Sequence, residues 1–149
     1  MRGTAGTGSL IVCTNNGMVV EYVDAHWDGV DVRWVGATII EVIEAAKTAV
    51  RRGSKLFSSP LAGVYESDPL GGGRERAVAV NPYLSLVLGP PAGSLDFESA
   101  KKLDDAAKAL RRRDNLRFLR YGDEEIHYFQ TKDLQTLGVT LEYACSFDF

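Results

Sequence analysis

Neutral polar side chains stand at the ends of several short apolar runs in the sequence. Asn15 and Asn16 follow the run 9–13, and Ser58 and Ser59 close the run 54–59. In open α/β sheets, ligands sit beyond the carboxyl ends of the strands, where helix N-termini direct backbone N–H groups outward. We therefore expect a small polar or anionic ligand at this edge of the sheet. The candidate ligand-binding residues are Asn15, Asn16, Ser58, Ser59, Pro60, Asn81 and Tyr83.

Each candidate also has an ordinary structural role. Asn15 can cap a helix, Ser59 and Pro60 can form a turn, and Asn81 with Pro82 can begin a strand. For any one residue the structural role is the commoner one. Convergence of the separate segments in space would favour a binding site.

No catalytic constellation is recognisable. His26 and His127 lack clustered partners, so they predict neither the base of a serine nucleophile nor a metal site, and the G-x-S-x-G turn is absent. Cys13 lies within a predicted strand without a neighbouring cation, which argues against a reactive thiolate. The glycines at 71–73 lack the flanking residues of a phosphate-binding loop. The catalytic residues stay unassigned, and we expect neither a metal nor a cofactor.

The charge balance gives no general reason to bind nucleic acid. Seventeen lysines and arginines stand against 20 aspartates and glutamates, a formal net charge of −3. One run, ALRRRDNLRFLR at 109–120, is locally basic. It is either a solvated helix end whose cations complement the helix dipole, or a patch for an acidic partner at Arg112, Arg113 and Arg117.

Length and composition favour a single α/β domain over 1–149. The first residues, 1–8, lack the apolar core of a signal peptide and are expected to be a flexible N-terminus. No run has the length of a membrane span, and the two cysteines lack metal-ligand or redox spacing. We therefore expect a cytoplasmic protein without a membrane partner.

The apolar periodicity of the first sixty residues alternates between strand and helix. It predicts strands over 9–13, 31–36 and 54–59, a helix over 17–26, and a helix that follows a T-x-x-E capping box at Thr38 and Glu41. This alternation favours a parallel sheet with crossover helices. The expected fold is a single-domain, Rossmann-like, three-layer α/β/α arrangement with a mainly parallel sheet of about 4–5 strands.

The second half of the chain is less regular. Residues 64–80 read as a mobile, glycine-rich insertion. A buried strand is predicted over 83–88, and a helix capped by Ser94 or Asp96 follows it. The stretch 125–131 fits either an edge strand or a helix, and a closing helix is predicted from residue 133 onward.

Several segments in a fixed order resemble the GrdX family, small proteins of unknown biochemical role encoded beside the glycine, sarcosine and betaine reductase systems of anaerobic bacteria. The similar segments are TNN at 14–16, VRRGSKLFSSPLAG at 50–63, NPYLS at 81–85, LDFES at 95–99 and YFQTKDL at 128–134. The family tends to have threonine and histidine before the proline, where this chain has Ser58 and Ser59. It also tends to have a proline after the asparagines, where this chain has Gly17, and to lack the stretch 64–80.

The resemblance implies a non-catalytic accessory or small-ligand-binding protein linked to amino-acid reductase metabolism. A glycine, sarcosine or betaine reductase component and a second copy of the chain are the protein partners it suggests. Two alternatives stay open. One is a small transferase or hydrolase that acts on an amino acid or a phosphorylated metabolite, and the other is a scaffold that docks a reductase subunit.

Overall fold

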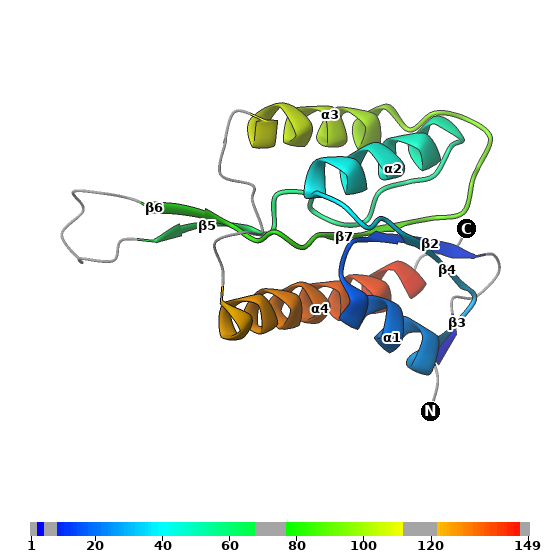
Figure 1. The fold of residues 1–149 in the computed structure, drawn as a ribbon. Helices are drawn as coiled ribbons and strands as arrows, with labels where there is room; N and C mark the ends of the chain where they lie inside the picture. Colours follow the sequence, from blue (N-terminus) through cyan, green and yellow to red (C-terminus); the bar gives the residue numbers. More distant parts are fainter. Residues whose placement is uncertain (1–2, 5–8, 68–76, 112–121, 147–149) are drawn as a thin grey trace.

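The computed structural model describes residues 3–4, 9–67, 77–111 and 122–146 of the chain, which form a mixed α/β arrangement (Figure 1). The helices are α1 (Gly17–His26), α2 (Ile39–Arg51), α3 (Phe97–Arg111) and α4 (Asp123–Cys145). The strands are β1 (Gly3–Thr4), β2 (Leu10–Thr14), β3 (Trp27–Asp28), β4 (Val30–Trp34), β5 (Val64–Ser67), β6 (Ala77–Val80) and β7 (Ser85–Leu88). The α/β class predicted from the sequence is confirmed.

The central sheet has three strands in the order β4-β2-β7. Val12 of β2 pairs with Val32 of β4 in a parallel register and with Val87 of β7 in an antiparallel one. The predicted mainly parallel sheet of about 4–5 strands is therefore corrected to a mixed sheet, which does not support a Rossmann-like layout. The physical reason is the connection before β7. A parallel neighbour needs a long crossover, whereas the chain returns to β7 through the β5–β6 pair and runs the opposite way.

Helices cover both faces of this sheet (Figure 1). On one face, Ile11 and Leu86 of the sheet share a buried core with α2 and α3, to which α2 contributes Ile43. On the other face, Val12 and Val87 pack with α1 and α4. Alternate residues of a strand point to opposite faces, which is why the fully buried run of β2 supplies both cores.

The predicted strand 54–59 does not form; the segment makes only one isolated β-bridge to β7. Leu56 pairs antiparallel with Leu88, the Phe57 N–H donates to the Val87 carbonyl (2.9 Å), and the Gly89 N–H donates to the Lys55 carbonyl (2.8 Å). The segment therefore lines the outer edge of β7. It turns away after residue 57, where the Ser58 hydroxyl accepts the Val87 N–H (2.8 Å).

The glycine-rich stretch 64–80 begins and ends with strands. β5 and β6 pair antiparallel, and the pair projects away from the three layers as an arm (Figure 1). The residues between them, 68–76, lie outside the described part of the chain. Of the predicted flexible N-terminus 1–8, residues 3–4 form β1, which pairs parallel with β3, and the others are not described.

The ambiguous stretch 125–131 belongs to helix α4, which continues through Gly138 to Cys145. Asp96 caps α3, since its carboxylate accepts the Ser99 N–H (3.3 Å). The predicted capping box of α2 does not form: Thr38 occupies the N-cap position, but its side chain makes no capping hydrogen bond. Among the described residues, no helix combines the length and apolar character needed to cross a membrane.

Candidate functional site

A buried carboxyl group lies where both asparagines meet the start of β7. Asp133, on the inner face of α4, is only 8% exposed. Its Oδ2 accepts hydrogen bonds from the Ser85 hydroxyl (2.6 Å) and from Asn16 Nδ2 (3.0 Å). Burial raises the pKa of Asp133 above its usual range, while the hydrogen bonds from Ser85 and Asn16 oppose that rise. A positive charge placed beside Asp133 would therefore stabilise the ionised form of its carboxyl group.

A chain of hydroxyl groups leads from β2 to this carboxyl. Thr14 Oγ1 lies 2.7 Å from Ser85 Oγ and accepts the Asn16 N–H (3.0 Å). Because a serine hydroxyl has one hydrogen and that of Ser85 is directed to Asp133, Thr14 is the donor to Ser85. Thr14 and Ser85 face each other in the β2–β7 register, so strand pairing itself fixes this contact.

Asn16 is both a helix cap and a partner of α4. Its side-chain carbonyl accepts the Met18 N–H (3.1 Å), which caps α1. Its amide group donates to the Gln130 carbonyl (3.0 Å) and to Asp133. Both amide hydrogens are therefore used within the protein, and Asn16 positions Asp133 from behind.

Asn15 and Asn81 fasten the loops around the site. Asn15 donates to the Ala37 and Pro82 carbonyls (2.9 and 3.0 Å) and accepts the Leu84 N–H (2.9 Å). Asn81 donates to the carbonyl of Phe129 (2.9 Å). Both side chains are almost fully buried, and they tie the loop before β7 to β2, to the start of α2 and to α4.

A narrow cavity opens beside Asp133. Its volume is about 20 Å³, enough for a group the size of one water molecule. Four of the residues predicted from the sequence line it, although they come from two separate segments: Ser58, Ser59, Asn81 and Tyr83. Helix α4 completes the wall with Lys132, Asp133 and Thr136. The convergence that would favour a site is thus met for these four residues.

Most residues that line this cavity are polar, although the larger part of the lining surface is apolar. Burial raises the pKa of Tyr83, so its hydroxyl stays protonated at neutral pH. Lys132 is exposed, and its ammonium group lies 5.6 Å from the centre of the Tyr128 ring. Lys132 and Asp133, which are adjacent in α4, both contribute to the lining of the cavity. Gly63 fits here because a side chain on it would approach Asn81 Cβ to 3.0 Å.

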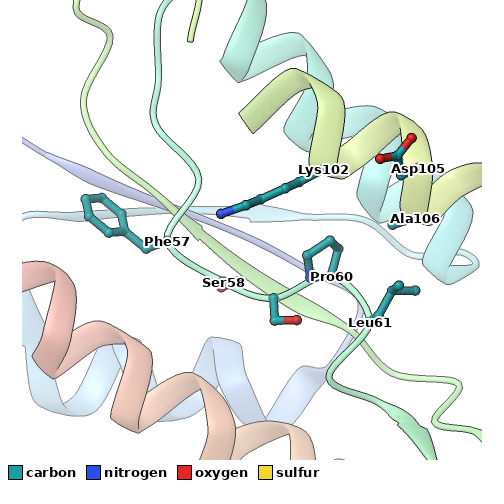
Figure 2. A pocket seen from close by; sticks show the side chains of 8 residues that line it. Phe57, Ser58, Pro60, Leu61, Lys102, Asp105 and Ala106 are labelled. Carbon is teal, nitrogen blue, oxygen red and sulfur yellow. The ribbon is translucent and has the colours of Figure 1, made fainter. Parts of the chain in front are cut away.

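A second, wider hollow lies on the other side of the same loop. It measures about 350 Å³ and is lined by Ser58, Ser59, Pro60 and Leu61 from the loop and by Lys102, Asp105 and Ala106 from α3, together with Phe57. Figure 2 shows Lys102 extending from α3 across the hollow toward the loop. Pro60 therefore belongs to this hollow and does not line the Asp133 cavity.

Sequence reasoning missed Ser85, Lys132, Asp133 and Thr136. Asp133 and Ser85 both lie inside segments that resemble the GrdX family, YFQTKDL and NPYLS, but an acidic residue at the expected start of a helix looks like an ordinary solvated group. The signal that was available is its spacing. Asp133 precedes Leu137 and Leu141 at intervals of four residues, which places it on the buried face of α4.

The other predicted features give no second reactive centre. No group of three or more potential metal ligands gathers among the described residues. The His26 ring packs against the Tyr22 ring, with 5.0 Å between their centres. Burial raises the pKa of Cys13 to about 11, in keeping with an unreactive thiol. Arg111 pairs with Glu44 (2.9 Å), whereas the predicted partner patch Arg112, Arg113 and Arg117 lies outside the described residues.

Comparison of the chain with models of protein families, with curated proteins and with solved structures found no significant match.

Proposed function

We propose that the protein is a non-catalytic accessory protein that binds a small zwitterionic amine, of which glycine is the simplest, at the Asp133 cavity. The observation that carries the proposal is the juxtaposition of a buried carboxyl group with four independently predicted polar residues around one cavity. A buried carboxyl group is costly to ionise unless a positive charge compensates it. A ligand ammonium group supplies that compensation.

The charges around the cavity favour a zwitterion over a simple anion or cation. The Asp133 carboxylate attracts a cation and repels an anion. Lys132 also lines the cavity, is exposed to solvent and carries a positive charge. An α-amino acid carries its ammonium and carboxylate groups on the same carbon. One small molecule can therefore contact both Asp133 and Lys132.

The size of the cavity adds selectivity. A volume of about 20 Å³ accommodates a primary ammonium group, which is close to the size of a water molecule. A trimethylammonium group is several times larger and has no N–H donor for Asp133. We therefore rank glycine above sarcosine, and sarcosine above betaine.

The link to amino-acid reductase metabolism is part of the same proposal and rests on the segments that resemble the GrdX family. Those segments include most of the residues that line the cavity, among them the serines of FSSP, most of NPYLS, and the lysine and aspartate of YFQTKDL. TNN supports the cavity from behind. The accessory role is the one that this resemblance implies. The Ser58 hydroxyl accepts a backbone N–H and the Ser85 hydroxyl donates to Asp133, and we assign both hydroxyl groups to ordering the cavity walls.

Thermal melting against a small panel tests the proposal. The panel is glycine, sarcosine, betaine, methylammonium and acetate. At 100 times the dissociation constant, a ligand adds about 2.7 kcal/mol, which raises the Tm of a domain of this size by roughly 5–10 °C. Glycine should give the largest shift with the native chain and none with Asp133→Asn.

Asp105→Asn is the matched control, because Asp105 lines the other hollow and its substitution removes the same charge. It should keep the glycine shift. A shift with acetate alone, or an equal glycine shift in Asp133→Asn, would contradict the proposal. Chemical turnover of glycine, sarcosine or betaine would replace the accessory role with the enzyme alternative.

A further inference from the structure

Among the described residues, no strand pairs with the outer edge of β4. β4 pairs only with β2 among the described strands, so it forms one edge of the central sheet. Edge strands present unpaired backbone N–H and C=O groups, and proteins usually cover or disrupt them. β4 runs for five residues, Val-Asp-Val-Arg-Trp, without a proline or glycine to interrupt it.

The hydrogen bonds to β2 show which backbone groups point outward. The Leu10 N–H donates to the Gly29 carbonyl (3.0 Å), and the Val35 N–H donates to the Thr14 carbonyl (2.8 Å). In a parallel ladder, alternate residues direct their backbone groups to the same neighbour. Residues 29, 31, 33 and 35 therefore face β2. Val30, Val32 and Trp34 direct their N–H and C=O groups away from the sheet.

This arrangement matches a second copy of β4 about a two-fold axis through Val32. In that antiparallel register, Val32 faces Val32 of the second copy, and Val30 faces Trp34. Both are hydrogen-bonded pairs that use the outward backbone groups. Asp31 then faces Arg33 in the non-hydrogen-bonded pairs, where side chains approach most closely. Each opposite-charge contact occurs twice, once on either side of the axis.

The side chains on one face are apolar and incompletely covered. Val30, Val32 and Trp34 share a face because they alternate along the strand, and Trp34 is 57% exposed. Beside Val30 and Val32, a hollow of about 320 Å³ lies between β4 and α1. In the two-fold register, Trp34 of the second copy stands opposite Val30, next to this hollow.

We propose that the protein forms a symmetric homodimer through antiparallel pairing of two β4 edges centred on Val32. The two central sheets join into one continuous sheet. Arg33 Nε lies 3.3 Å from Asp31 Oδ2 within each copy. In the dimer these residues also contact their counterparts across the axis and determine the register, and each Trp34 covers the hollow of the other copy. Charged residues on an edge strand commonly prevent pairing. The outward backbone groups also allow registers shifted by two residues, but these place Asp31 opposite Asp31 or Arg33 opposite Arg33. The register centred on Val32 instead places opposite charges across from each other, which favours self-association. The dimer is independent of the ligand proposal.

Charge-swap variants test the interface by sedimentation velocity. The native chain should sediment as a dimer. Arg33→Asp and Asp31→Arg each place like charges opposite one another, and each should sediment as a monomer. An equimolar mixture of the two variants restores both opposite-charge contacts and should recover the dimer. The double variant D31R/R33D should also be a dimer.

The exposed pair Lys101 and Asp105 on α3 offers matched controls, because Lys101→Asp and Asp105→Lys make comparable charge changes away from β4. Both should remain dimers. Tryptophan emission, to which Trp27 beside the same hollow also contributes, should shift to shorter wavelength when the two β4 variants are mixed, compared with either variant alone. A monomeric native chain, a dimer that persists in both single β4 variants, or a mixture that stays monomeric would overturn the proposal.

Discussion

The Ser85 hydroxyl donates a 2.6 Å hydrogen bond to Asp133 Oδ2, which joins the first residue of β7 to the inner face of α4. The same oxygen accepts Asn16 Nδ2, so the end of β2, the start of β7 and the middle of α4 meet at one carboxyl group. This junction orders the walls of the cavity. It also makes the stability of the fold and the affinity for a ligand depend on the same residues.

Replacing Asn16 should destabilise the fold. Asn16→Ala removes the cap of α1 and leaves the Gln130 carbonyl and Asp133 without their amide donor. A lost cap costs about 1 kcal/mol, and because Asp133 keeps its hydrogen bond from Ser85, the lost amide donor adds about 1–3 kcal/mol in total. We expect the free energy of unfolding in urea to fall by roughly 2–4 kcal/mol. Gly17→Ala is the neighbouring control, since an added methyl group meets no atom within 4 Å; a loss for Asn16→Ala no larger than that of this control would contradict the network.

The stability of the native chain should depend on pH through Asp133. Its pKa in the folded state is raised above the usual value of 3.8. The folded chain therefore binds more protons than the unfolded chain between these two values, and the stability contributed by Asp133 is lost as pH rises through the folded pKa. Asp133→Asn should remove this dependence, at most about 1.4 kcal/mol per pH unit. Urea unfolding of the two chains across acidic pH measures the difference, and parallel curves would show that Asp133 titrates normally.

Cys13 should not react in the folded protein. It is fully buried in β2, and burial raises its pKa to about 11. Because the thiolate is the reactive form, iodoacetamide at pH 8 should leave Cys13 unmodified and should modify the half-buried Cys145 faster. Mass spectrometry of the digested chain distinguishes the two sites. Equal modification of both before unfolding would show that the core around Cys13 opens readily.

Gly53 should be the least replaceable of the described glycines. Its φ is +98°, and a side chain on it would come within 2.6 Å of the Gly93 backbone nitrogen. Gly53→Ala combines a strained backbone with a clash between two backbone segments, so we expect a loss of at least about 1–3 kcal/mol in the free energy of unfolding. Thermal melting compared with Gly17→Ala checks this. Equal melting temperatures for the two variants would contradict this, because they would mean that the backbone segments at Gly53 and Gly93 can separate with no loss of stability.

Local patterning predicted the elements better than it predicted their pairing. The strands near 9–13, 31–36 and 83–88 and the helix over 17–26 are confirmed, because their apolar periods reflect burial on one or two faces. The mainly parallel sheet of about 4–5 strands is not found, since β7 pairs antiparallel with β2 and strand direction depends on how the chain returns to the sheet. The segment 54–59 is apolar enough for a strand, yet it meets β7 at a single bridge before turning.

The sequence indicated several residues that lie around one cavity, but it did not indicate the hydrogen bonds that hold them there. Ser58, Ser59, Asn81 and Tyr83 do line one cavity. Asn15 and Asn16 lie behind it with their amide hydrogens used by the protein, and Pro60 faces the other hollow. Asp133 was missed because its importance comes from tertiary burial by α4, β2 and β7, which no local sequence pattern of charge reveals.

The most direct test is the pKa of the Asp133 carboxyl group, measured by carbon-13 NMR with and without saturating glycine. Asp133→Asn identifies the signal by its disappearance. A ligand ammonium group at this carboxyl favours its ionised form, so the account predicts a raised pKa in the free protein that falls when glycine binds. A pKa that stays unchanged or rises with glycine would contradict the account.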